Sequence, residues 1–140
     1  MHAASAHLLG RVTYQGFAAA WPTMEGTGEF GEKMNSLRKY VVSSTLADVD
    51  ASWSDTTVIR GDLVTEVATL KAEPGGDLLV QGSCQLAHAL MERGLVDEYR
   101  LMIFPIVLGS GKRLFAELHA VSKLTQRRPT GLVLLAYRSA

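Results

Sequence analysis

Cysteine is almost absent from this sequence of 140 residues, because Cys84 is the only one. A single cysteine can form no intrachain disulfide, and it excludes a cysteine-rich metal site. Four histidines are present, and their positions do not match the spacing of a metal-ligand set: His2, His7, His88 and His119. The sequence therefore predicts neither a disulfide-stapled fold nor a metal centre.

Long apolar runs and an excess of charge of one sign are also missing. No stretch of 18 apolar residues occurs and the opening residues do not resemble a signal peptide, so we expect a cytoplasmic protein with no membrane partner. Basic and acidic residues number 14 each, and this balance argues against nucleic acid as a partner. The length and the 47% hydrophobic content predict one domain over residues 1–140, large enough to bury a core.

The clearest local pattern is a strand, a tight glycine turn, a helix and a second strand in the middle of the chain. Leu78–Val80 is a short apolar run bounded by turn residues, which is typical of a strand buried on both faces. Gln81-Gly82-Ser83 then turns into a helical pattern, with Ser83 as its N-cap and Gly94 just after its end. Tyr99–Phe104 predicts the second strand.

Weaker patterns define the other elements. Helices are predicted over Thr13–Trp21, after Phe30 and over Leu63–Leu70, and strands over Tyr40–Val42, Thr56–Ile59, Val121–Gln126 and Leu132–Tyr137. At the start, the alanine-rich segment His2–His7 is expected to be the last turn of a helix, and Leu8-Leu9 a very short strand. Because so short a strand is a poor beginning for a sheet, we expect a segment upstream of Met1 to be missing.

Strands that alternate with helices and finish in a strand pair predict an α/β fold. Its sheet should be mixed and mostly parallel, with antiparallel C-terminal strands and helices on both faces. Short polar segments follow three of the strands: Gly10-Arg11-Val12-Thr13, Ser43-Ser44-Thr45 and Gln81-Gly82-Ser83. In an open α/β sheet, ligands bind beyond the carboxyl ends of the strands, so these segments are candidates for one binding site.

The chemistry of the three segments suits phosphate. Arg11 can make a forked contact with a phosphate group, and the hydroxyls of Thr13 and the serines add neutral donors. A glycine turn at a helix N-terminus presents free N–H groups and the positive end of the helix dipole. Together they predict a site for a nucleotide with more than one phosphate. Taken singly, each has a simpler explanation that stays open: a solvated charge for Arg11, and ordinary turn chemistry for the serines and Gly82.

Four segments in order resemble the dihydrofolate reductase superfamily, and within it the riboflavin-biosynthesis reductase type known as the RibD C-terminal domain. They are LLGRVTYQGF at 8–17, KYVVSSTL at 39–46, LLVQGSCQLAHALMERGLVDEYRL at 78–101 and FPIVLGSGKRLF at 104–115. The resemblance implies a dihydrofolate-reductase-like three-layer fold and NADPH as the cofactor. Members of the family begin with a further strand, loop and helix that line the substrate pocket, and this sequence lacks them, so no catalytic residue can be carried over.

The resemblance also assigns cofactor-binding residues by position. The first phosphate-contacting turn corresponds to Gly10, Arg11, Val12 and Thr13. The segment beside the adenosine ribose and its 2′-phosphate corresponds to Ser43, Ser44 and Thr45. The turn under the pyrophosphate corresponds to Gln81, Gly82 and Ser83. The usual pair of glycines in the last turn is reduced to Gly82. Leu108, Gly109 and Gly111 resemble a loop near the substrate, with a plain surface loop as the alternative.

We therefore predict an NADPH-dependent oxidoreductase that resembles 5-amino-6-(5-phosphoribosylamino)uracil reductase of riboflavin biosynthesis and acts on a small-molecule substrate. One alternative is a non-catalytic or truncated nucleotide-binding protein that dimerises, and another is a dihydrofolate-type reductase of a different small heterocycle. The apolar run Tyr99–Ile106 exceeds what one domain needs, and it predicts the face of a homodimer.

Overall fold

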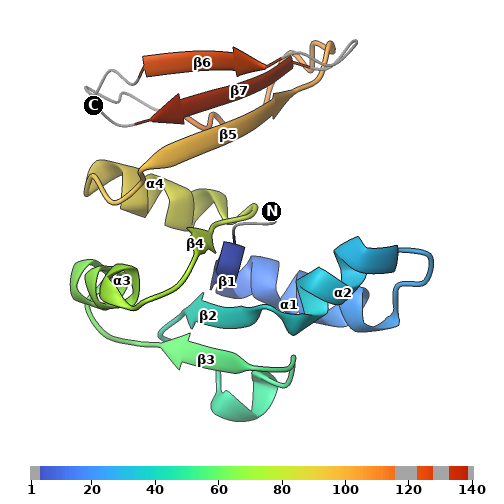
Figure 1. Cartoon of the computed structure of the whole chain (residues 1–140), viewed down its shortest axis with the longest axis vertical. Coiled ribbons are helices and arrows are strands. Elements are labelled where there is room, and N and C mark those ends of the chain that lie inside the picture. Colours follow the sequence, from blue (N-terminus) through green and yellow to red (C-terminus); the bar gives the residue numbers. More distant parts are fainter. Residues whose placement is uncertain (1–3, 116–122, 128–132, 139–140) are drawn as a thin grey trace. The chain divides into compact units, whose positions relative to one another are not determined.

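The computed structural model of the chain describes residues 4–115, 123–127 and 133–138 (Figure 1). The chain forms two compact units, residues 1–87 and 88–140, and each is described by itself below. In the described part of the chain, no helix combines the length and apolar character that a membrane crossing requires.

The first unit is built on a four-stranded parallel sheet with the strand order β3-β2-β1-β4. The strands are β1 (Ala4–Gly10), β2 (Arg38–Val42), β3 (Thr56–Ile59) and β4 (Asp77–Leu79). In register, Gly10 at the end of β1 is the partner of Val42 at the end of β2. Because all four strands run in the same direction, their carboxyl ends share one edge of the sheet.

Three helices connect these strands: α1 (Arg11–Ala20), α2 (Gly28–Ser36) and α3 (Leu63–Ala72). Two short 3₁₀ turns lie at Trp21–Thr23 and Asp48–Asp50. The α1–α2 connection steps from β1 to β2, whereas α3 returns the chain from β3 to β4 in the opposite direction. Since parallel crossovers are right-handed, the two connections lie on opposite faces of the sheet, as Figure 1 shows.

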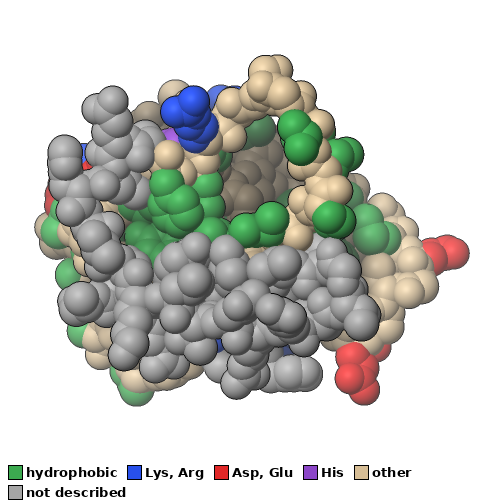
Figure 2. Space-filling model, turned by 90° about the horizontal axis from the view of Figure 1, so that it is seen from above, with side chains coloured by type: hydrophobic (Ala, Val, Ile, Leu, Met, Phe, Trp, Pro, Cys, Tyr) green, Lys and Arg blue, Asp and Glu red, His purple; other side chains and the backbone are tan. Residues whose placement is uncertain are grey.

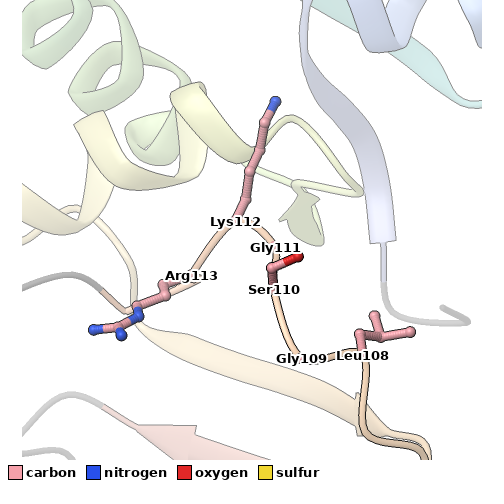
Figure 3. A pocket seen from close by; sticks show the side chains of 6 residues that line it. All are labelled: Leu108, Gly109, Ser110, Gly111, Lys112 and Arg113. Atoms are coloured by element: carbon pink, nitrogen blue, oxygen red, sulfur yellow. The ribbon is translucent and has the colours of Figure 1, made fainter.

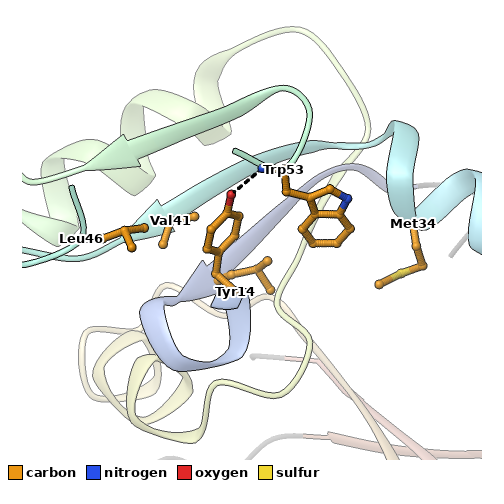
Figure 4. Close-up of a cluster of buried hydrophobic side chains, with 6 residues drawn as sticks. Tyr14, Met34, Val41, Leu46 and Trp53 are labelled. Carbon is orange, nitrogen blue, oxygen red and sulfur yellow. Dashed lines mark hydrogen bonds between the residues drawn. The ribbon is translucent and has the colours of Figure 1, made fainter. Parts of the chain in front are cut away.

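The core of the first unit lies between the sheet and the α1–α2 side (Figure 4). It consists of six buried side chains: Leu9, Tyr14, Met34, Val41, Leu46 and Trp53. The Tyr14 hydroxyl accepts a hydrogen bond from the Trp53 backbone N–H at 3.0 Å, and the two rings are 6.1 Å apart. Tyr14 belongs to the first helical turn of α1, so this packing fixes the start of α1 at the carboxyl edge of the sheet.

The second unit contains a three-stranded sheet with the order β5-β7-β6. Its strands are β5 (Glu98–Ile103), β6 (Lys123–Arg127) and β7 (Val133–Arg138), and β7 pairs antiparallel with both neighbours. The helix α4 (Cys84–Glu92) begins in the first unit and ends in the second. Of the two predicted closing strands, residues 121, 122 and 132 lie outside the described residues.

The α/β class is confirmed, but the prediction for the first residues of the chain is wrong. Residues 4–7 belong to β1, and the predicted helical tail and very short strand are parts of this one strand of seven residues. The predicted turn at Gly10–Thr13 is also absent, since β1 ends at Gly10 and α1 starts at Arg11. Alanine favours helix only weakly, and here pairing with β2 on one side and β4 on the other overrides that preference.

Candidate nucleotide-binding site

The structure brings the three predicted segments to one edge of the first sheet. Gly10 ends β1, Ser43 directly follows β2, and Gln81-Gly82-Ser83 lies between β4 and α4. Since β1 is flanked by β2 and β4, the segments after these three strands are neighbours. The described part of the molecule therefore has the strand-end arrangement that the sequence predicted.

Two hydrogen bonds join the turn after β4 to the junction between β1 and α1. The Gly10 backbone N–H donates to Ser83 Oγ at 3.0 Å, and the Ser83 backbone N–H donates to Thr13 Oγ1 at 3.1 Å. These bonds join residues 70 or more positions apart in the sequence. They hold the start of α1 and the start of α4 together.

Gly82 occupies a position that favours glycine for two reasons. Its φ of +64° lies in the left-handed region, which side chains other than glycine adopt with strain. A Cβ atom at this position would also lie 3.3 Å from Thr13 Cγ2. The glycine therefore allows the turn to approach α1 closely.

The N-terminus of α1 carries the features of an anion site. Gly10 precedes the helix in an extended conformation, no side chain caps the helix end, and its first turn contains no acidic residue. The first N–H groups of a helix lack intrahelical partners, and the helix dipole adds positive charge there. Val12 in this turn is 73% exposed, whereas Tyr14 in the same turn is buried in the core. Arg11 adds an exposed guanidinium whose Nη1 donates to Gln15 Oε1 at 3.2 Å.

Ser43 and its neighbours play different parts. Ser43 Oγ accepts hydrogen bonds from the backbone N–H groups of Thr45 at 3.2 Å and Leu46 at 3.0 Å, so this hydroxyl shapes the local turn. Ser44 and Thr45 are exposed. Within this segment, the geometry leaves Ser44 and Thr45 as the side chains that a ligand can reach.

The sequence analysis missed Arg60, which follows β3 at the same edge of the sheet. Arg60 Nη2 donates to the Leu46 carbonyl at 2.6 Å and lies 3.0 Å from Asp48 Oδ1. Its guanidinium is thereby held beside the turn that Ser43 begins. A basic residue directly after a strand is the signal that selected Arg11, and it would have selected Arg60 as well.

Gln81 Oε1 is buried and has no hydrogen-bond partner in the described part of the chain. A buried acceptor without a partner is unfavourable unless another donor reaches it. Gln81 lies in the turn after β4, and its buried oxygen is not exposed to a ligand in this structure.

The loop Leu108–Arg113 belongs to the second unit and lines an open hollow of about 540 Å³. Figure 3 shows that the side chains of Leu108, Lys112 and Arg113 point in different directions rather than toward one point. Gly109 has a φ of +75°, as expected for a tight loop. His88 Nε2 lies within hydrogen-bond distance of the carbonyl oxygens of Arg113 and Leu114, at 3.1 and 2.7 Å. His88 therefore contacts the C-terminal end of this loop. The proposed role of the loop near a substrate stays a prediction.

The sequence analysis also missed a buried pair of basic side chains, His7 and Lys39, which are partners in the β1–β2 register. Burial and the nearby Lys39 charge lower the pKa of His7 to about 4. Burial lowers the pKa of Lys39 to about 8, while Asp55 acts in the opposite direction. Lys39 Nζ donates to the carbonyls of Asn35 and Ser54, and it lies 4.3 Å from the centre of the Trp53 ring. These contacts satisfy the buried ammonium group of Lys39, so its role is structural.

The fold and its carboxyl edge define the class of α/β domains that bind ligands beyond the ends of parallel strands. The chain belongs to the RibD C-terminal domain family, whose model matches residues 1–132. No group of three or more potential metal ligands occurs in the part of the chain that the structure describes.

Two Bacillus subtilis (strain 168) proteins, both uncharacterized, are similar in sequence. YyaP is 34% identical over 113 residues, which cover 78% of this chain and 58% of YyaP. YwjB is 39% identical over 57 residues, which cover 41% of this chain and 33% of YwjB. The chain thus spans less than two thirds of the length of either relative.

Solved structures share the fold. A protein of Shewanella sp. PV-4 described as a riboflavin biosynthesis protein superposes with a TM-score of 0.70 at 24% identity, over 97% of this chain and 74% of that one. Form 2 of Acinetobacter baumannii RibD gives a TM-score of 0.65 at 14% identity, over 97% of this chain and 47% of that one. At such identities the likeness shows the dihydrofolate-reductase-like fold alone.

Proposed function

We propose that this chain is a reductase domain that binds NADPH at the carboxyl edge of the first sheet. Its substrate would be a ribosylamino-pyrimidine, as for 5-amino-6-(5-phosphoribosylamino)uracil reductase, or a similar small heterocycle. The observation that carries the proposal is the uncapped N-terminus of α1, held against the Gly82 turn and flanked by Arg11. Membership of the RibD C-terminal domain family supports it.

The residues at this edge fit a phosphorylated dinucleotide. The free N–H groups of α1 and the close approach at Gly82 suit the pyrophosphate. Ser44 and Thr45, with the guanidinium of Arg60 beside their turn, suit the ribose and its 2′-phosphate. When bound, NADPH would supply a hydride, and the protein would hold it and the substrate in reactive geometry.

The test is titration calorimetry with NADPH and with NADH on the wild type and on Arg11→Ala. The wild type should bind NADPH more tightly, and Arg11→Ala should weaken NADPH binding by about 1.5–3 kcal/mol, the size of a charge-assisted hydrogen bond. Arg38→Ala is the matched control, because Arg38 begins β2 at the opposite edge and pairs with Asp55 at 3.3 Å. Failure of the wild type to bind either nucleotide would refute the proposal.

Turnover needs a separate assay, since binding alone does not establish a reductase. Loss of NADPH absorbance with the ribosylamino-pyrimidine as substrate should be measured after binding has been shown. We assign no catalytic residue, because the family resemblance carries none over to this sequence. NADPH binding without turnover of any small heterocycle would favour the non-catalytic alternative.

A second candidate function, a dimer built on the second unit, has its own supporting observation. An apolar run at and after the end of β5 is exposed: Met102, Ile103, Phe104, Ile106, Val107 and Leu108. Val107 is 94% exposed. Figure 2 shows green apolar side chains on the face of the molecule that is turned toward the viewer. Large contiguous apolar patches mark interaction sites, and a second copy would cover this patch with its own. Light scattering should give a dimer mass that Ile106→Lys reduces to a monomer mass, whereas a monomeric wild type would refute the dimer.

A further inference from the structure

Ser83 stands out by its backbone. Its φ is +53°, directly after Gly82 at +64°, and the described residues include one other non-glycine residue with positive φ, Asp55. A side chain in this region is strained by about 1–2 kcal/mol. Such strain persists only where the surrounding structure holds the residue in place.

Three polar groups of Ser83 are bound by three different elements. Its hydroxyl oxygen accepts from Gly10 at the end of β1, its N–H donates to Thr13 in α1, and its carbonyl accepts from Ala87 N–H in α4 at 2.8 Å. Ser83 is therefore the point where the strand, the first helix and the fourth helix meet. This arrangement offsets the strain and fixes where α4 begins.

The same bonds change what the two hydroxyls can do for a ligand. Thr13 Oγ1 and Ser83 Oγ each accept a backbone N–H, so one lone pair of each hydroxyl is engaged inside the protein. A hydroxyl has one proton and two lone pairs, and each oxygen therefore keeps its proton for donation. The Gly10 N–H, by contrast, is already bound by Ser83.

We propose that Thr13 and Ser83 are positioning residues: they hold the Gly82 turn against the N-terminus of α1 so that both bind one diphosphate as a single unit. This inference rests on the proposed nucleotide site. It assigns the two hydroxyls a role beyond that of phosphate donors. It also explains why a strained serine lies where an unstrained glycine would fit the backbone.

The experiment compares two probes that differ in the diphosphate. NADPH contains the diphosphate, whereas adenosine 2′-phosphate contains only the group expected near Ser44. Thr13→Val removes the acceptor for the Ser83 N–H with almost no change in shape, and Thr13→Ser retains it. We expect Thr13→Val and Ser83→Ala to weaken NADPH binding roughly fivefold to twentyfold, the range for losing one or two hydrogen bonds. Binding of adenosine 2′-phosphate, followed by NMR titration, should change by less than about twofold.

The outcomes separate the possibilities. Selective loss for NADPH, with near wild-type binding in Thr13→Ser, would support the positioning role. Equal loss for both probes would show a general structural defect and overturn it, as would unchanged NADPH binding in both variants. A wild type that binds neither probe would overturn the proposed function and this inference together. In Ser83→Ala, faster exchange of the Gly10 amide hydrogen would show directly that the Ser83 bond had been lost.

Discussion

His7 lies in β1 with its side chain fully buried, and both ring nitrogens have no hydrogen-bond partner in the described part of the chain. Its register partner in β2 is Lys39, which is also buried and cationic. A proton on His7 would therefore be buried beside a like charge without an acceptor. We predict that His7 makes the stability of this protein sensitive to acid, and that His7→Leu removes this sensitivity.

The magnitude follows from the pKa of His7, which is about 4 in the folded protein and 6.5 in an ordinary environment. Because the folded-state pKa is depressed, the unfolded chain binds more protons between these two values. The contribution of neutral His7 is fully present above pH 6.5 and is lost as the pH falls through about 4. The full loss is about 3 kcal/mol, of which about 2 kcal/mol falls between about pH 7.5 and about pH 5.

The assay is urea denaturation at these two pH values, monitored by tryptophan fluorescence, since Trp53 is buried in the core. The difference in unfolding free energy between the two pH values should be smaller in His7→Leu than in the wild type by about 2 kcal/mol. Val41→Ala is the control, because Val41 is buried in the same sheet and carries no titratable group. It should lower stability equally at both pH values. An unchanged pH difference in His7→Leu would refute the reasoning.

Two further predictions concern Gly82 and Tyr14. Gly82→Ala should destabilise the protein by more than Gly94→Ala: both have φ above +60°, but only at Gly82 would the new Cβ meet Thr13, at 3.3 Å, while at Gly94 nothing lies within 4 Å. At each site, backbone strain should lower the unfolding free energy by about 1–2 kcal/mol, and at Gly82 the steric contact adds a further loss. Both losses are measured by urea denaturation. Equal losses would contradict the close approach. Tyr14→Phe removes the acceptor for the Trp53 N–H and should destabilise by about 1–2 kcal/mol in the same assay, with no effect expected if that bond does not form.

Local sequence patterns predicted much of the architecture. The bounds of β3 are those expected, and α3 begins after Asp62, whose side chain accepts from the Thr65 N–H at 3.0 Å as a helix cap should. The polar segments after β1, β2 and β4 were predicted to share an edge, and they do. These features depend on a few consecutive residues and on the rule that parallel strands end together, so the sequence could specify them.

Other features depend on which segments meet in space. Residues 4–7 are Ala, Ser, Ala and His, four small or polar residues that favour no strand by themselves, yet they belong to a central strand because β2 and β4 pair with it. Similarly, Ser83 looked like a helix cap, but its hydroxyl accepts from Gly10, which lies 73 positions earlier. The sequence by itself determined the α/β class, most elements and the edge of the sheet at which the three polar segments lie. Only the tertiary structure decided how the hydroxyls there are used and that His7 is buried beside Lys39, because hydrogen bonds and burial between distant residues depend on the path of the whole chain.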